Sequence, residues 1–89
     1  MHAIVTRVTI SDRERAEAFL REELVPRLSS VPGFVSGYWV NLGDRGTSIA
    51  VFESEEAAQQ AMPSGDGPQP PADAVQVESM DLGEVVHSA

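Results

Sequence analysis

The chain has 89 residues, a formal net charge of −8 and a pI near 4.4, which fits one domain. The negative charge disfavours binding to nucleic acid or to an anionic membrane surface. The sequence has no cysteine and no lysine, which excludes disulfides, thiolate chemistry and Schiff-base catalysis. Because the N-terminus resembles neither a signal peptide nor a membrane span, we expect a cytoplasmic protein.

Residues 2–10 alternate as a β-strand does. Ile4, Thr6 and Val8 share one face, whereas Val5 and Arg7 share the other. Both faces are largely apolar, which is typical of a strand in the middle of a sheet with a cover on each side. Helices of this chain provide one cover, and the chain is too short to provide the second.

A long helix is expected next. Ser11 and Glu14 have the spacing of a capping box, which predicts a helix start at this point. Apolar residues then recur at three- and four-residue steps as far as Val31, which predicts one buried helix face. Pro26 lacks a backbone donor, so we expect a kink or a new turn there.

The segment 34–42 is rich in aromatic and β-branched residues and predicts a second strand. Residues 43–46 have the composition of a turn, and a third strand follows at 47–53. Strict alternation places Phe34 and Tyr38 on one face and Trp39 on the other.

Ser54 is the expected N-cap of a second helix that ends near Met62. Residues 63–72 are rich in proline and glycine, and we expect a flexible loop there. A last strand is predicted within residues 74–86, with a break near Gly83.

The resulting order is βαββαβ. Right-handed crossovers make this order an antiparallel four-stranded sheet with both helices on one face, an α+β, ferredoxin-like fold in a single domain that spans residues 1–89. The other sheet face stays apolar, which is rare in a monomer. We therefore predict a homodimer in which two sheets pack face to face, a dimeric α+β barrel.

Two junctions resemble those of a known family. Pro32-Gly33-Phe34 and the segment Val51 to Ala57 (VFESEEA) resemble the helix-to-strand and strand-to-helix junctions of the antibiotic biosynthesis monooxygenase-like family, and the likeness covers residues 2–62. The resemblance implies a dimeric α+β barrel. Members include cofactor-free oxygenases of aromatic polyketides and quinols, and haem-degrading oxygenases. The residues that haem-degrading members use fall on Arg7, Ala61 and Pro71 here, and none matches, so we expect no cofactor.

Trp39, Asn41 and Arg7 are the candidate site residues. Trp39 and Asn41 either line a ligand pocket or, for Trp39, anchor the core or a dimer interface. Arg7 lies mid-strand among apolar residues and needs a partner. That partner is either an anionic ligand or enolate, or a carboxylate of the last strand (Glu78, Asp81 or Glu84). His2 and His87 either face solvent or approach each other as a weak metal site.

We hypothesise a cofactor-independent, monooxygenase-like enzyme that acts on a small aromatic or quinol compound through Arg7, Trp39 and Asn41. The alternative is a non-catalytic dimeric protein that binds a small ligand or has a role in a stress response. A third hypothesis is an isomerase or lyase of small acids. The fold alone does not distinguish these functions. The expected partners are a second copy and a small aromatic ligand, with no nucleic acid and no membrane.

Overall fold

The computed structural model describes residues 1–62 and 73–87. Its elements, in chain order, are β1 (His2–Ile10), α1 (Arg13–Phe19), the π-helix η1 (Leu20–Leu24), α2 (Val25–Ser29), β2 (Phe34–Asn41), β3 (Arg45–Phe52), α3 (Glu55–Ala61) and β4 (Val75–Glu84). The order confirms the predicted strand and helix sequence. The loop expected at 63–72 lies outside the described residues.

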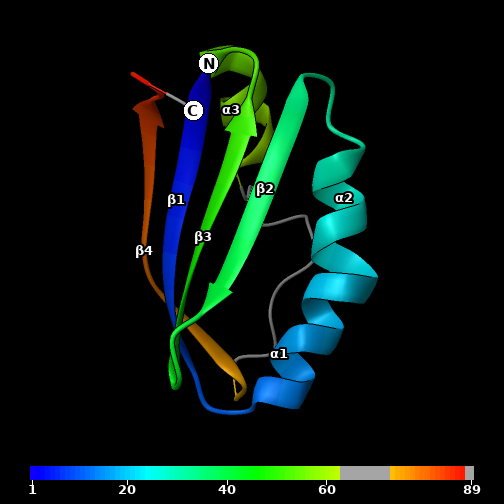
Figure 1. Ribbon diagram of the computed structural model, residues 1–89. Coiled ribbons are helices and arrows are strands. Elements are labelled where there is room, and N and C mark those ends of the chain that lie inside the picture. The colour runs from blue at the N-terminus through cyan, green and yellow to red at the C-terminus, as the bar shows by residue number, and fades with distance from the viewer. Residues whose placement is uncertain (63–72, 88–89) are drawn as a thin grey trace.

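The four strands form one sheet in the order β2-β3-β1-β4, and all neighbouring pairs are antiparallel. Figure 1 shows the continuous helical rod of α1, η1 and α2 beside the sheet, with α3 near the end where β1 begins. Ile4 and Phe52 of the sheet pack against Leu28 of α2 and Ala58 of α3, so both helical segments cover the same face. The predicted α+β, ferredoxin-like fold is confirmed. The uncovered side is called the open face below.

The rod begins one residue later than the capping box suggested. Asp12, not Ser11, is the N-cap: its backbone is extended, with φ −135°, and its carboxylate accepts a hydrogen bond from the amide of Arg15. The two neighbouring residues are both good caps, and only the path of the chain decides between them.

Pro26 perturbs the rod as expected, although by widening rather than by a sharp kink. Directly before it, the amide of Val25 donates to the carbonyl of Leu20, a five-residue step that makes η1 a π-helix. In a regular α-helix the ring of Pro26 would crowd the carbonyl of Glu22. A π-turn next to the proline is a known way to absorb such a conflict.

The two junction motifs contact each other in space. Gly33 has a φ of 90°, and a Cβ there would lie 2.9 Å from the Cβ of Ala57, at the start of α3. The backbone carbonyl of Gly33 accepts a hydrogen bond of 2.7 Å from the amide of Glu53. Glycine and alanine at these positions therefore allow the end of the rod and the start of α3 to meet closely.

The core lies at the end of the sheet that α3 covers. Phe52 is fully buried, and its ring meets that of Phe34 edge to face, with centroids 5.6 Å apart. Around them the buried side chains are small, mostly alanines from α3 and β3. Small side chains bring α3 close to the sheet there. The larger Leu and Phe side chains of the rod keep the rod farther from the sheet.

A bulge corrects the predicted face of Phe34. Phe34 pairs with Phe52 and Ser36 pairs with Val51, so Val35 is the extra residue on β2. The bulge turns Phe34 into the core on the same side as Trp39. It leaves Tyr38, Val40 and Ile49 on the open face with 65%, 48% and 42% of their surfaces exposed. On β4 the irregularity falls opposite Arg7 and Val8, with Glu78 as the extra residue, and not near Gly83 as expected.

Candidate functional site

A cavity of about 310 Å³ lies between the sheet and the helical rod. This volume is at the lower end of the range of ~300 to 1,000 Å³ found for small-molecule sites. Its walls are largely apolar: Phe19, Leu20 and Leu24 line it from the rod, and Ile4 and Val8 line it from β1. An apolar enclosure of this size suits a small ring compound.

Strand register orders the cavity floor in rows across the sheet. One row runs from β2 to β4 through Trp39, Ser48, Thr6 and Met80, which are successive cross-strand partners. All four line the cavity. This row therefore has two hydroxyl residues at its centre, with Trp39 at the β2 end and Met80 at the β4 end.

The indole of Trp39 lies back along its own strand. A Cβ built on Gly37 would lie 2.7 Å from Cη2 and 2.9 Å from Cζ3 of Trp39. The absence of a side chain at Gly37 therefore makes room for the ring, and close approach of this kind is one reason for a glycine within a strand. The indole is also packed against the edge of the core, so Trp39 both lines the cavity and contacts the core.

Asn41 lines the cavity at the next position along this face of β2. Its Oδ1 accepts a hydrogen bond of 2.9 Å from the amide of Gly43, which begins the β2–β3 turn with a φ of 86°. Since the carbonyl oxygen of the side chain is engaged, its NH₂ group is the part that remains to donate to a ligand.

The charged residues that line the cavity come from the rod: Arg13 and Glu17 from α1, and Arg27 from α2. Among the described residues Glu17 is the only carboxylate in the lining, and no histidine contributes to it. The floor therefore offers hydrogen-bonding groups and an aromatic surface, with acid–base groups confined to the helical wall.

Arg7 lies on the open face, away from Trp39 and Asn41. Its side chain is exposed, and its cross-strand partners are Thr47 and Ser79. Among the described residues no carboxylate lies within 4.0 Å of its guanidinium. The structure thus brings together two of the three candidate residues, and it shows neither the expected ion pair with β4 nor a place for Arg7 in this cavity.

Sequence reasoning gave no role to Thr6, Ser48 and Met80. The alternation of β1 did place Thr6 on the face of Ile4 and Val8, and the structure confirms that placement. The pairing of Thr6 with Ser48 depends on register between strands that are about 40 residues apart, so no local pattern could have revealed it.

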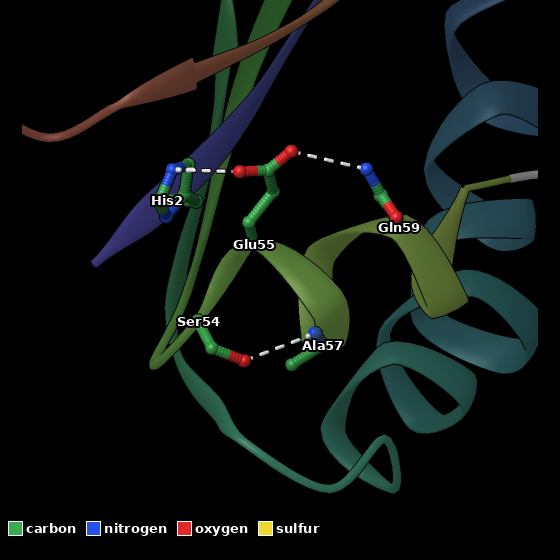
Figure 2. Close-up of polar contacts among 5 residues, drawn as sticks. All are labelled: His2, Ser54, Glu55, Ala57 and Gln59. Carbon is green, nitrogen blue, oxygen red and sulfur yellow. Dashed lines mark hydrogen bonds and ion pairs between the residues drawn. The ribbon is translucent and has the colours of Figure 1, made fainter.

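The two histidines lie outside the cavity. Figure 2 shows Glu55 between His2 of β1 and Gln59 of α3. The Nε2 of His2 is 3.7 Å from a Glu55 carboxylate oxygen, and Gln59 donates to the other oxygen at 3.2 Å. His87 is exposed. Across residues 1–62 and 73–87, no three His, Cys, Asp or Glu side chains are grouped in a way that could hold a metal ion.

One ion pair ties α1 to the turn that precedes β4. The Nη1 of Arg15 is 2.6 Å from a carboxylate oxygen of Asp73. This hydrogen bond lowers the pKa of Asp73 below its usual value and raises the pKa of Arg15. Neither residue lines the cavity, so the pair joins two segments of the fold rather than serving chemistry at the floor.

No helix in the described part of the chain is both long and apolar enough to span a membrane. No family model matches the sequence, and no curated protein matches it.

Solved structures do resemble the whole chain. SnoaB of Streptomyces nogalater, described as a cofactor-independent oxygenase, superposes with a TM-score of 0.75 at 17% identity over 98% of this chain and 94% of that chain. A dimeric ferredoxin-like protein from an uncultured marine organism gives 0.66 at 17% identity over 100% and 98%. HapK of Hahella chejuensis gives 0.64 at 13% identity over 100% and 96%. At these identities the shared property is the fold, and the chain has the ferredoxin-like α+β fold of these proteins.

Proposed function

We propose that this protein is a cofactor-independent, monooxygenase-like enzyme that oxidises a small aromatic or quinol compound. The observation that carries the proposal is the apolar cavity with Trp39, Asn41 and two hydroxyls on its floor. The likeness to SnoaB, which is described as a cofactor-independent oxygenase, supports it through the fold.

In such a reaction the substrate itself supplies the electrons. An activated CH₂ group loses a proton to give a stabilised anion, which reacts with O₂. One oxygen atom becomes the new carbonyl, and the other leaves as water with the two hydrogens. The protein must keep water out and stabilise the anion. The apolar walls reduce the water around a bound ligand, and the NH₂ of Asn41, which bonds to no other described residue, is available as a donor to the anion.

Oxygen uptake with anthrone tests the proposal. The expected result is uptake above the autoxidation of anthrone without protein, with anthraquinone as the product. Trp39→Ala and Asn41→Ala should each lower the rate at least tenfold, since each removes a group from the floor. If the wild-type rate equals autoxidation for anthrone and for a naphthoquinol, the proposal is wrong.

Arg7→Ala tells which face of the sheet hosts the reaction. Arg7 remains a candidate catalytic residue, although it lies on the open face of its own chain. If the reaction takes place in the cavity, this variant should keep its turnover. Loss of turnover in Arg7→Ala with normal rates in Trp39→Ala would move the reaction to the open face.

A non-catalytic binding protein is the second candidate. The observation that favours it is the scarcity of acid–base groups, because Glu17 is the only carboxylate among the described cavity residues. A bound ligand at 100 times its Kd raises stability by about 2.7 kcal/mol, which shifts the Tm of a domain of this size by ~10 °C or more. A thermal shift with anthrone but no oxygen uptake would support this candidate.

We also propose that the open face is the interface of a homodimer. Tyr38, Val40 and Ile49 expose large apolar surfaces there, and one structural neighbour is described as dimeric. A stable interface covers ~800 Å² per partner. On the described strands, the charged side chains of this face are Arg7 and Arg45 against Glu78 and Asp81, two positive and two negative. The face is thus neutral on a chain of net charge −8, which limits repulsion between two copies.

Light scattering after size-exclusion chromatography tests the interface. The wild type should have about twice the chain mass of 9.6 kDa. Ile49→Glu buries a charge in the proposed interface and should give monomers. Gln60→Glu adds the same charge on the exposed side of α3 and should leave the dimer intact. A monomeric wild type, or a dimeric Ile49→Glu, would contradict the proposal.

A further inference from the structure

We propose that Thr6 and Ser48 form a two-hydroxyl site that binds the oxygen of a neutral fused-ring phenol or ketone on the cavity floor. The inference rests on the proposed function in that it concerns the same cavity. It goes further because it names the groups that select the ligand and the chemical class that they select.

The two hydroxyls are close to each other by register. Thr6 and Ser48 are direct partners in the antiparallel pairing of β1 with β3, and both line the cavity. Side chains of such partners have Cβ atoms about 4.5–5.5 Å apart. One ligand oxygen can therefore lie between them, and each hydroxyl can donate or accept.

Both hydroxyls lack a partner of their own. Among residues 1–62 and 73–87, no hydrogen bond joins the hydroxyl of Thr6 or Ser48 to another protein group. Thr47, on the opposite face, bonds instead to the backbone carbonyl of Thr6. Both residues are partly exposed and line the cavity, so each hydroxyl is open to water or to a ligand, and Val and Ala would serve a purely structural floor as well.

The two outer residues of the row, Trp39 and Met80, favour a ligand with a flat apolar ring system. Trp39 and Met80 flank the hydroxyls on β2 and β4, and at ~4.8 Å between strands the row spans roughly 14 Å. Indole and thioether groups both contact aromatic rings favourably. The ligand oxygen at the centre of the row therefore comes with rings that extend toward one or both ends.

The charge of the chain favours a neutral ligand. Hydroxyls alone stabilise a full negative charge weakly, and the net charge of −8 disfavours approach of an anion. The rod places Arg13 and Arg27 in the cavity lining, but the hydroxyl pair lies on the strands opposite. A phenol or an aryl ketone thus fits the centre of the floor better than a carboxylate does.

A matched pair of probes, 1-naphthol and naphthalene, tests the site. The chain has one tryptophan, so a single indole N–H signal in a ¹⁵N-correlated NMR spectrum reports on the floor, and equilibrium dialysis gives the affinities. A purely apolar cavity would favour naphthalene, the more hydrophobic compound. We expect the wild type to bind 1-naphthol about tenfold more tightly, since two neutral hydrogen bonds that each contribute roughly two- to tenfold give about four- to a hundredfold together.

Thr6→Val/Ser48→Ala should lose this preference to within about threefold and keep its affinity for naphthalene. Its Tm should equal or exceed that of the wild type, which also shows that the variant folds. The control Thr9→Val/Ser79→Ala removes two hydroxyls from the open face of β1 and β4 and should keep the preference. If the variant retains the preference, or the wild type prefers naphthalene or binds neither probe, the two-hydroxyl site is wrong.

These outcomes are independent of oxygen uptake. A protein that prefers 1-naphthol through the two hydroxyls but never oxidises anthrone keeps the binding site and loses the proposed oxygenase activity. A protein that oxidises anthrone and shows no preference between the two probes would support the oxygenase activity and contradict the two-hydroxyl site.

Discussion

The position of the Trp39 ring depends on the absence of a side chain at Gly37. Replacing Gly37 with alanine would put a Cβ 2.7 Å from Cη2 and 2.9 Å from Cζ3 of the indole. Ordinary contacts between carbon atoms are ~3.5–4.0 Å, so the ring must move by roughly 1 Å. The ring of Phe34, 3.4 Å from the same point, limits movement toward the core and directs it over the cavity floor.

The expected effect on stability follows from two opposing terms. Overpacking of this kind costs about 1–3 kcal/mol, whereas replacing a glycine within a strand with alanine recovers roughly 0.5–1 kcal/mol of backbone entropy. Gly83 provides the matched control because a Cβ there has no atom of the structure within 4 Å. Gly83→Ala should gain the backbone-entropy term without the overpacking cost. The free energies of unfolding of the two variants should therefore differ by about 1–3 kcal/mol.

Thermal unfolding and the indole N–H signal measure the two consequences. The Tm of Gly37→Ala should lie below that of Gly83→Ala by at least ~4 °C, given 4–8 °C per kcal/mol for a domain of this size. The indole signal should shift in Gly37→Ala and stay in place in Gly83→Ala. Equal stabilities together with an unmoved indole signal in both variants would show that Gly37 does not position Trp39.

Three further predictions concern the frame around the cavity. Ser54→Ala removes the hydroxyl that accepts from the amide of Ala57 (Figure 2) and should cost ~1 kcal/mol in urea unfolding, while Ser54→Asp should keep most of the stability. Phe52→Ala empties the fully buried core position and should lower the free energy of unfolding in urea by about 3–5 kcal/mol. Because Arg15 lowers the pKa of Asp73, their pair stabilises the fold above the ordinary pKa of Asp and stops doing so as the pH falls through the lowered value. Asp73→Asn should therefore lower the Tm slightly at about pH 6, and this difference should shrink as the pH falls below the ordinary pKa of Asp.

Local sequence patterns are enough to predict the order of the helices and strands and several of their boundaries. The alternation in β1, the apolar period of the rod and the cap at Ser54 are each set by neighbouring residues, and the structure agrees with all three. The cap of the rod was misplaced because Ser11 and Asp12 are both suitable caps.

Features that depend on two distant segments were not predictable in the same way. The bulge at Val35 changes the face of Phe34 although nothing in the local alternation marks it. The partners of Thr6 and the position of Arg7 relative to β4 likewise depend on inter-strand register. The residue types thus indicated Trp39 and Asn41 as candidates, and both line the cavity, whereas the neighbours of Trp39 across the sheet could not be predicted without the strand register.

Strand alternation gives β1 two roles on the two sides of one sheet. Thr6 and Val8 line the cavity, and Val5 and Arg7 face the proposed dimer interface. A slip of one residue would exchange the two sets, so both faces depend on the same register. The bulges occur on the edge strands, at Val35 of β2 and beside Glu78 of β4, and the β1–β3 pairing at the centre is regular. The proposed hydroxyl pair therefore lies in the regular part of the sheet, and side chains on regular strands are positioned more precisely than side chains on loops.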